Sequence, residues 1–433
     1  MTTSHGSGTQ DPVLIKTTLG SRQFILNRPR HLNALNMEMV RIIWPNLKAW
    51  EDSDKVNVIL LKGNGRAMCA GGDVKYVVEL CKNRDPELME LLDTEYQMFH
   101  FIGTMKTPYI AVMDGITMGA GSGLAVHAPF RVATENTRFA MPENAIGLFP
   151  DVGASFFLSR LDGQLGTYLG MTGKTIHADD VLYSGIATHL VPSSRLPALE
   201  ERLAELNSPD HDIVHAIISE FSAETKRNTD SHYTLYGDVR KTIDNYDRAE
   251  DIVAALKKDA SDFALDARDT ILSRSPTSVK LTLHNLRTAA HLDFAECLRH
   301  EHALWQKVAT HHDFEEGVTA HVIRKERPRW NPSSLDEISH TYLMENYFNN
   351  SNGKPLQLLS DKSYHLHPFR KFALPSEKDI QQLILETKPG TTRHGTIDSI
   401  IKLHNNRFGI CEKIVDVLGR KTNTTTDGRI EWV

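Results

Sequence analysis

The stretch from Met141 to Asp151 reads MPENAIGLFPD, and it holds two carboxylates among apolar residues. Glu143 and Asp151 each follow a proline directly. Burying a carboxylate is costly unless the group is paired or used. Taken alone, Glu143 could simply end a strand or cap a turn, and Asp151 could serve as a helix N-cap. The segments on either side are therefore needed to tell whether these acids have a structural or a chemical role.

Upstream of this stretch, a strand, a glycine-rich loop and a helix follow one another twice. Val56 to Lys62 has the pattern of a buried strand and leads into MCAGGDVKYVVEL. Tyr109 to Met113 leads in the same way into GITMGAGSGLAVHA. Phe130 to Thr134 and Arg138 to Met141 are expected to be short strands. The pattern predicts an α/β fold with parallel strands and right-handed crossovers.

The remaining segments divide the chain into regions. Two N-terminal strands, a helix from Met37 to Trp50 interrupted by Pro45, and a longer helix from Pro86 to Met105 are predicted. Beyond Ser155 the pattern is mostly helical, and the charged, proline-rich KERPRWNPSS at 325–334 indicates a boundary. Turns dominate the tail, with helices expected at 376–387 and 395–418. We predict a disordered lead (1–12), a core carrying the active site (13–207), a helical region completing that domain (208–330) and a C-terminal extension (331–433).

Composition excludes several classes of protein. The chain has 433 residues and a net charge of −6, which gives no prior for nucleic-acid binding. The apolar runs are too short to span a bilayer. Four scattered cysteines are typical of reduced thiols in an intracellular compartment. His211 and His215 have the spacing of two metal ligands on a helix, but without a third ligand they favour a solvated helix face.

The two glycine-rich loops offer a chemical function. They are Ala70-Gly71-Gly72 and Gly119-Ala120-Gly121. Glycine permits close backbone approach, and N–H groups at a helix start lack partners within the helix. Together the loops could aim two N–H groups at one oxygen, as in an oxyanion hole. Tight strand–helix packing explains either loop alone, and neither has the spacing of a dinucleotide fingerprint or a P-loop.

In combination, the motifs resemble the crotonase (enoyl-CoA hydratase/isomerase) superfamily. They are NRPRHLNALN, MCAGGDV, TPYIAVMDGITMGAGSGLAVHAPFRVAT and RFAMPENAIGLFPDVGASFFLSRL. The resemblance runs in order from about Val13 to about Pro332 and is strongest from Phe130 to Leu161. It implies a crotonase-like ββα spiral with a helical C-terminal layer, to which this chain adds a C-terminal extension. Within the superfamily, the 3-hydroxyisobutyryl-CoA hydrolase family of valine breakdown is the most similar.

The resemblance also implies roles for particular residues. The N–H groups of Gly72 and Ala120 would hold the thioester carbonyl, although the family usually has glycine where Ala120 stands. Glu143 matches the catalytic carboxylate and Asp151 the acid that recognises the substrate hydroxyl. Glu95 matches a further substrate-binding acid. Positions that contact CoA in relatives match Arg30, Leu32 and, near the adenine, Ala70.

The implied activity is hydrolysis of 3-hydroxyisobutyryl-CoA in the mitochondrial matrix. Glu143 could attack as a nucleophile or act as general base for water, and the sequence does not separate the two. Coenzyme A enters as part of the substrate, and neither a metal nor another cofactor is expected. A hydratase or isomerase is the alternative within the superfamily. It is disfavoured because the stretch after Ala120 lacks the second glutamate that a hydratase would be expected to present.

A protein with a different class of function also resembles this sequence. Some fungal and plant mitochondrial ribosomes carry a small-subunit protein derived from the same hydrolase. The extension is close to electrically neutral, which favours a protein partner over direct contact with phosphates or DNA. Its apolar stripes, which include Ile380, Ile400 and Ile414, are expected to pack on the same chain or on a partner. The oligomeric state and the presence of an N-terminal presequence stay open, since MTTSHGSGTQDP contains no Arg or Lys.

Overall fold

In the computed structural model, the strands in the first half of the chain belong to two β-sheets. The model describes residues 11–224, 239, 243, 246–349, 353–386, 393–404, 407–425 and 430–432. Its strands up to residue 190 are β1 Val13–Thr18, β2 Ser21–Leu26, β3 Val58–Gly63, β4 Ala67–Cys69, β5 Tyr109–Met113, β6 Ile116–Met118, β7 Phe130–Ala133, β8 Arg138–Ala140, β9 Ile176–His177 and β10 His189–Leu190.

From β3 to β8, consecutive strands enter different sheets. One sheet has the order β1-β2-β3-β5-β7-β10 and the other the order β4-β6-β8-β9. Strands β2, β3, β5 and β7 pair in parallel, and so do β4, β6 and β8. Each repeat therefore adds one strand to each sheet, and helices follow the repeats, so the chain advances as a spiral. The predicted α/β fold with parallel strands is confirmed, although β4 and β6 were not predicted as strands.

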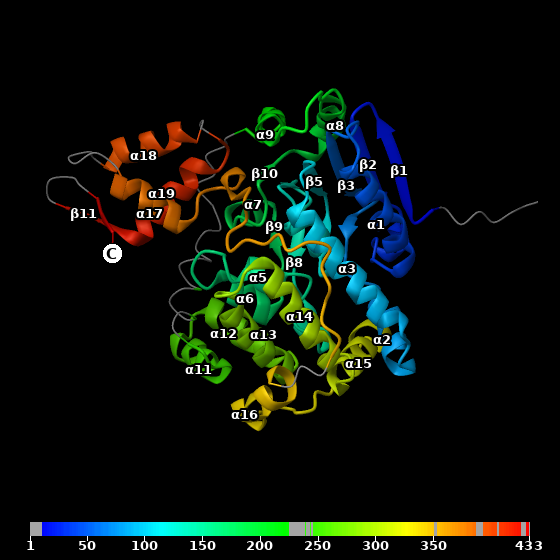
Figure 1. Ribbon diagram of the computed structural model, residues 1–433. Helices are drawn as coiled ribbons and strands as arrows, with labels where there is room; N and C mark the ends of the chain where they lie inside the picture. The colour runs from blue at the N-terminus through cyan, green and yellow to red at the C-terminus, as the bar shows by residue number, and fades with distance from the viewer. Residues whose placement is uncertain are drawn as a thin grey trace, which may run out of the picture.

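Helices surround this spiral and dominate the chain beyond it (Figure 1). Those of the first part are α1 Met37–Glu51, α2 Val74–Asn83, α3 Glu87–Thr104, α4 Ala120–Val126, α5 Ala154–Leu158, α6 Leu165–Thr172, α7 Ala178–Tyr183, α8 Leu196–Ala204 and α9 His211–Glu220. They are followed by α11 Ala249–Asp259, α12 Asp262–Leu272, α13 Pro276–Ala289, α14 Phe294–Val308, α15 His312–Val318 and α16 His340–Leu343. Helices α13 and α14 pack against α5, α6 and α3, so they cover the spiral.

Two predicted helix details were wrong. Helix α1 continues through Pro45 without interruption. Apolar residues on both sides of the proline are buried against the core, and the Asn46 amide donates a 2.8 Å hydrogen bond to the Ile42 carbonyl. The helix expected at 395–418 is two helices, α18 Arg393–Leu403 and α19 Ile410–Lys421. Gly409, which has a φ of 81°, takes a left-handed conformation and begins the second one.

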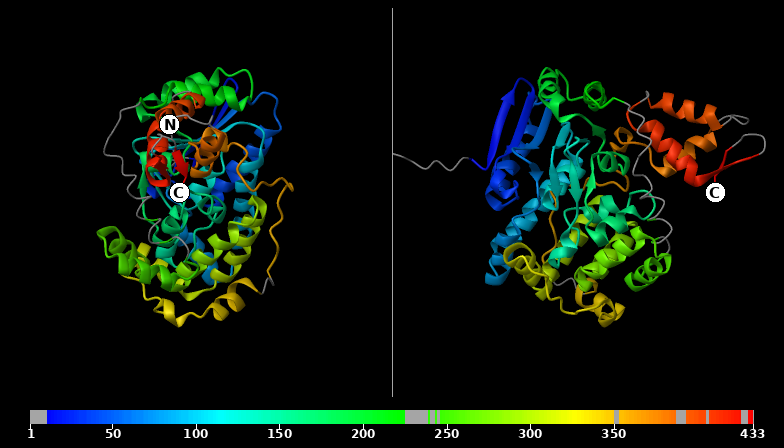
Figure 2. Two further views of the ribbon diagram at one scale, coloured as in Figure 1. Left: turned by 90° about the vertical axis from the view of Figure 1, so that its left-hand side faces the viewer. Right: turned by 180° about the vertical axis from the view of Figure 1, so that it is seen from behind.

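The C-terminal extension packs on the chain's own core. Helices α17 Glu377–Glu386, α18 and α19, with strands β11 Thr422–Thr424 and β12 Ile430–Trp432, form a lobe on the opposite side of the molecule from β1 (Figures 1 and 2). Ile380, Ile400 and Ile414 are buried. Buried Lys413 of this lobe forms a 2.7 Å ion pair with Asp162 of the core. The apolar stripes of the tail are therefore covered at least in part within the same chain.

An extended segment, residues 353–368, joins this lobe to the helical layer. It runs over the ends of α3 and α14, where Tyr364 accepts the backbone N–H of Phe294 and stacks on its ring at 5.0 Å. His100 of α3 hydrogen-bonds the Lys362 carbonyl at 2.8 Å. We call residues 353–368 the strap. It ties together two helices that carry candidate site residues.

Three expectations concern the ends and the surface of the chain. The predicted disordered lead lies outside the described residues up to position 10, and Val13 already belongs to β1. Among the helices of the described ranges, none is long and apolar enough to cross a membrane. His211 and His215 do not form a solvated face. They stack on Phe369 and Phe372 of the extension, because this part of the tail folds back onto α9.

Candidate active site

Three loops that carry predicted site residues leave the same edge of one sheet. Strands β4, β6 and β8 are parallel neighbours. Gly72 follows the end of β4, Ala120 follows β6 and Glu143 follows β8, each within three residues. The carboxyl ends of parallel neighbours lie side by side. The spiral therefore brings together residues that are 71 positions apart in the sequence, from 72 to 143.

The two glycine-rich loops touch each other. A Cβ atom on Gly119 would lie 3.3 Å from the Cα of Gly71, and one on Gly72 would lie 4.0 Å from the Cβ of Ala120. Gly71 and Gly119 have φ angles of 115° and 49°, which glycine adopts without strain. Ala120 is the first residue of α4 and is absent from the positive-φ residues, so alanine fits there. This close approach requires glycine at 71 and 119, and it leaves the neighbouring N–H groups at one place.

Neither the Gly72 N–H nor the Ala120 N–H donates a hydrogen bond within the described part of the chain. Ala120 is 7% exposed, so its N–H is not simply solvated. Buried backbone donors are almost always satisfied in native proteins. Two free donors in adjoining loops are therefore suited to receive an acceptor from outside the chain, such as a carbonyl oxygen.

Glu143 lies beside these loops. It begins a short 3-10 helix, Glu143–Ile146, and is 5% exposed. A Cβ on Gly119 would lie 3.0 Å from its Oε1, and its Oε2 has no hydrogen-bond partner among the described residues. Burial raises the pKa of Glu143 well above its usual range, and the nearby charge of Asp151 raises it further. Apart from its own backbone N–H, this carboxyl group has no hydrogen-bond donor among the described residues, and it stays available for chemistry.

Asp151 is the second acid of the site and is 7% exposed. Its Oδ2 accepts a 2.6 Å hydrogen bond from Nε1 of Trp305 on α14. Burial raises the pKa of Asp151 to about 6, although the bond from Trp305 acts in the opposite direction. The alternative role of Asp151 as a helix N-cap is absent, because α5 begins at Ala154 and Gly153 is its N-cap.

Asp151 opens a turn that another acid holds in place. Val152 and Gly153 both have left-handed φ angles, 56° and 83°, which is costly for a β-branched valine. Glu301 of α14 accepts the N–H groups of Gly153 at 2.7 Å and of Ser155 at 2.8 Å, as well as the Ser155 hydroxyl. Its side chain is fully buried. The turn after Asp151 is thus fixed by a carboxylate from 150 residues downstream.

Glu301 and Trp305 are site residues that the sequence reasoning missed. They lie four positions apart on α14, beside buried Leu298, so they share its inward face. A glutamate on the apolar face of a helix is a signal that could have identified Glu301. Its partners on the turn after Asp151 are set only by tertiary structure.

Glu95 joins the group as a fourth buried carboxyl. It lies on α3 and is 7% exposed. Burial raises its pKa to about 8, and the charge of Asp151 adds to this. Burial likewise raises the pKa of Glu301 to about 8. The site therefore concentrates four acids, of which Glu95, Glu143 and Asp151 were predicted from the sequence.

The residues predicted to contact CoA lie on adjoining loops. Arg30 is exposed in the short 3-10 helix Pro29–His31, and Leu32 follows it with a φ of 51°. The Ala70 N–H donates a 3.0 Å hydrogen bond to the Leu32 carbonyl. The Gly71 carbonyl accepts the Leu35 N–H at 2.8 Å, so the predicted CoA residues are continuous with the Gly72 loop.

The arrangement suits acyl transfer. Two amide donors could stabilise an oxyanion, and an unbonded carboxylate stands beside them. A second acid, aimed by an indole, could accept a hydrogen bond from the acyl group. No group of three or more His, Cys, Asp or Glu that could hold a metal ion occurs among the described residues.

Comparison with known proteins identifies close relatives. The family model described as enoyl-CoA hydratase/isomerase matches residues 21–348. The Neurospora crassa protein named small ribosomal subunit protein mS47 is 42% identical over 437 residues, covering 95% of this chain and 85% of its own. The Gallus gallus protein named 3-hydroxyisobutyryl-CoA hydrolase, mitochondrial, is 43% identical over 335 residues, covering 76% of this chain and 87% of its own.

A solved structure confirms the predicted fold. The crystal structure of a carnitinyl-CoA dehydratase from Mycobacterium thermoresistibile superposes with a TM-score of 0.74 at 31% sequence identity. The match covers 81% of this chain and all of that one. About a fifth of this chain therefore has no counterpart in that structure.

Proposed function

The chain belongs to the enoyl-CoA hydratase/isomerase family, and from this premise we propose that it hydrolyses 3-hydroxyisobutyryl-CoA to 3-hydroxyisobutyrate and CoA. The observation that carries the proposal is the position of Glu143. Its carboxyl group is buried, has an oxygen without a partner, and lies against Gly119, the residue before the free amide donor of Ala120. Such a carboxyl group has a chemical use rather than a structural one.

The thioester carbonyl oxygen lies between the N–H groups of Gly72 and Ala120 in this mechanism. Attack on the carbonyl carbon moves charge onto that oxygen. Preorganised donors stabilise the developing oxyanion by roughly 3–4 kcal/mol each, judged by removal of one such donor in other enzymes. Both donors are backbone groups, so alanine at position 120 serves as well as glycine.

Glu143 then cleaves the thioester by one of two routes. As a nucleophile, its carboxylate oxygen bonds to the carbonyl carbon, the C–S bond breaks, and CoA leaves as a thiolate that takes a proton. Water next opens the mixed anhydride and restores the carboxylate. As a general base, Glu143 takes a proton from the attacking water and passes it to the departing sulfur. Both routes need the ionised carboxylate.

Asp151 recognises the 3-hydroxyl of the acyl group. Its Oδ2 is occupied by Trp305, and within the described part of the chain the only other hydrogen bond to this carboxylate comes from its own backbone N–H. The substrate hydroxyl would donate to Oδ1, and Glu95 would offer a further acceptor nearby. A site built around a buried hydrogen bond rejects an acyl group without the hydroxyl. Arg30, Leu32 and Ala70 would contact the CoA moiety.

The same geometry argues against hydration or isomerisation. Those reactions would be expected to use a second catalytic glutamate shortly after Ala120, and the helix there reads AGSGLAV. The other two buried acids do not take the place of that second glutamate. Glu301 accepts hydrogen bonds from the turn after Asp151, and Glu95 lies on a different helix.

Thiol release from purified full-length protein tests the proposal. We expect rapid release of CoA from 3-hydroxyisobutyryl-CoA, slower release from 3-hydroxypropionyl-CoA, and much slower release from isobutyryl-CoA, which lacks the hydroxyl. Crotonyl-CoA supplies the matched test of hydration, followed by loss of its double bond. Hydration of crotonyl-CoA without CoA release would assign the chain to the hydratases instead.

A second function rests on a separate observation, which is the share of this chain that each sequence match covers. The match to the Neurospora mS47 protein covers 95% of this chain, whereas the match to the Gallus hydrolase covers 76%. The extension is thus shared with a ribosomal relative. We infer that the chain is mitochondrial and that its extension docks on a protein of the mitochondrial ribosomal small subunit, alongside or instead of catalysis.

Sedimentation of mitochondrial ribosomes separates these roles. Tagged full-length protein should travel with the small subunit on a sucrose gradient, whereas a chain that ends after Leu374, which lacks α17, α18 and α19, should stay at the top. Glu143→Gln should co-sediment like the parent, because catalysis is not needed for docking. Full-length protein that remains at the top would leave hydrolysis as the sole function supported.

A further inference from the structure

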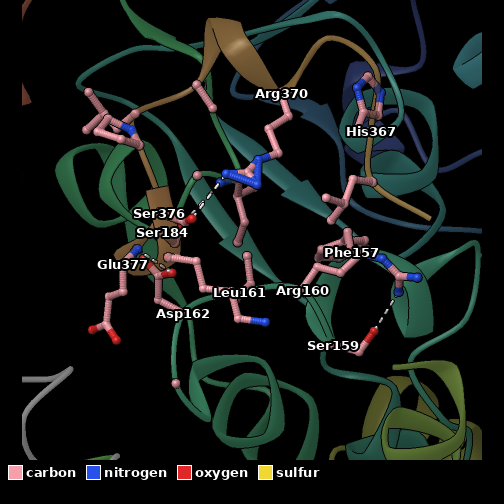
Figure 3. Close-up of a pocket in the computed structure, with 18 of the residues that line it drawn as sticks. Phe157, Ser159, Arg160, Leu161, Asp162, Ser184, His367, Arg370, Ser376 and Glu377 are labelled. Atoms are coloured by element: carbon pink, nitrogen blue, oxygen red, sulfur yellow. Dashed lines mark hydrogen bonds between the residues drawn. The ribbon is translucent and has the colours of Figure 1, made fainter. Parts of the chain in front are cut away.

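A large cavity separates the core from the C-terminal lobe. Its volume is about 730 Å³, within the range of roughly 300–1,000 Å³ that ligand pockets occupy. Figure 3 shows Arg370 and His367 from the tail side, across from Phe157, Arg160 and Leu161 of the core. None of the residues assigned above to the acyl-CoA site lines this cavity.

The charge of the cavity is strongly positive. Six lining residues are Lys or Arg and two, Asp162 and Glu377, are acidic. The cations are Arg131, Arg160, Arg370, Lys378, Lys413 and Lys421. Three of them have acidic partners: Arg370 pairs with Asp379, Lys413 with Asp162 and Lys421 with Glu377. For the other three, no carboxylate of the described residues lies within ion-pair distance, although the charge of Asp293 acts on Arg160.

Arg131 is the most unusual of these three. It is 6% exposed, and its guanidinium donates to the carbonyls of Ala128, Gly185 and Ile186. An arginine has five N–H donors, so these three hydrogen bonds leave part of the guanidinium group unused. A buried charge is expensive unless an opposite charge compensates it. The carbonyls orient this guanidinium but do not neutralise it.

Arg160 repeats the arrangement on the core wall. It donates to the carbonyls of Phe156, Ala289, Leu292 and His365, and it lies 3.8 Å from the centre of the Phe156 ring. The guanidinium is therefore held in one place without an ion pair. Two rigid guanidinium groups in one cavity, neither of them in an ion pair, are an arrangement suited to binding phosphates.

We propose that this cavity is a second ligand site, which takes a small organic phosphate whose negative charge forms the ion pair that Arg131 and Arg160 lack. The half-buried rings of Phe157 and Trp432 line the same space and offer apolar surface to the organic part. Lys378, exposed at the rim, adds to the attraction. The site is independent of the proposed hydrolysis and would exist if the acyl-CoA site had another use.

Calorimetric titration of the full-length protein tests the site with two probes. Uridine diphosphate carries a ring and two phosphates but no adenine, and inorganic pyrophosphate carries the phosphates alone. We expect both to bind with a stoichiometry of one and uridine diphosphate to bind more tightly, because only it contacts the aromatic walls. Saturating CoA should leave both affinities unchanged, since it occupies a different site.

A matched pair of charge reversals locates the binding. Lys378→Glu should weaken both probes by about fivefold, the scale of a rim charge, while thiol release stays at the parental rate. Lys402→Glu reverses an exposed lysine of α18 that does not line the cavity, and it should change affinity by less than about twofold. Both side chains are exposed, so neither change should disturb folding.

Four results would contradict the proposal. Absence of heat with either probe would show that no phosphate binds. Equal losses in Lys378→Glu and Lys402→Glu would reduce the effect to general surface charge. Displacement of uridine diphosphate by CoA would indicate that the phosphate binds at the acyl-CoA site and not in this cavity. Equal affinities of the two probes would contradict the organic part of the proposal and assign the cavity to free phosphate.

Discussion

Trp305 donates the hydrogen of its indole Nε1 to Oδ2 of Asp151 at 2.6 Å, across 154 positions in the sequence. One helical turn earlier, Glu301 accepts the N–H groups of Gly153 and Ser155. A single face of α14 therefore holds the acid and the turn that follows it. The orientation of Asp151 depends on a helix that is not part of the glycine-rich spiral.

Replacing Glu143 with Gln should leave a folded protein with little turnover. The amide can neither attack the thioester nor take a proton, so we expect CoA release to fall by at least about a thousandfold, more than a general base alone contributes on average. The unpartnered, buried carboxyl is lost, so the melting temperature should not fall. Glu38→Gln, an exposed glutamate of α1, is the control. Retention of turnover in Glu143→Gln would remove Glu143 from the mechanism.

Replacing Asp151 with Asn should reduce selectivity more than rate. The amide oxygen can still accept the Trp305 N–H, but the charged acceptor for the substrate hydroxyl is gone. We expect the ratio of kcat/KM for 3-hydroxyisobutyryl-CoA over isobutyryl-CoA to fall by about tenfold or more. Asp52→Asn, at an exposed position, should leave the ratio unchanged. An unchanged ratio in Asp151→Asn would mean that another group reads the hydroxyl.

Replacing Trp305 with Phe should destabilise the fold. The ring still fills its space, but Asp151 loses the donor to a buried, charged oxygen, which costs roughly 1.5–3 kcal/mol. Urea unfolding measures this loss. Trp330→Phe is the matched control, because its indole also donates to the protein, at 3.1 Å to the Ser273 carbonyl, but in a solvent-exposed hydrogen bond. Equal and small losses in both variants would show that the Asp151–Trp305 bond carries little energy.

The pH dependence of hydrolysis should report the pKa of Glu143. The ionised carboxylate is the active form, and burial with the charge of Asp151 raises its pKa above the usual value. Activity should therefore rise with pH, and the midpoint of this acid limb should lie well above the ordinary pKa of a glutamate. In Asp151→Asn the neighbouring charge is removed, so the limb should move to lower pH. A limb that stays in place, or moves upward, contradicts this electrostatic coupling.

Two truncations separate the strap from the C-terminal lobe. A chain ending after Pro332 loses the strap and exposes Phe294 and Phe156, which Tyr364 contacts, so its solubility and melting temperature should fall. A chain ending after Leu374 keeps the strap and should retain hydrolysis per folded site. Any soluble product of the shorter chain should also keep its active-site residues. A well-folded truncation that binds CoA without hydrolysis would assign the tail a part in the chemistry.

Local sequence determined the repeating part of the fold. Buried strands such as Tyr109–Met113 are followed by glycine-rich loops and helices, and this order predicted the α/β layout that the structure confirms. The same motifs led to Gly72, Ala120, Glu143 and Asp151 as a candidate site. Their roles remain predictions, but their proximity follows from parallel strands that end at one edge of a sheet.

Tertiary structure alone decided the contacts made over long separations. Strands β4 and β6 have three residues each, too few for a periodic pattern, yet they align the two amide loops. Glu301 and Trp305 approach Asp151 only because α14 packs on the turn after it. The strap and the apolar faces of α17 and α19 likewise find partners far away in sequence. The local sequence pattern predicts which face of a helix or strand is apolar. The residues that this face contacts, and the partners of each buried acid on it, depend on packing against elements far away in the sequence.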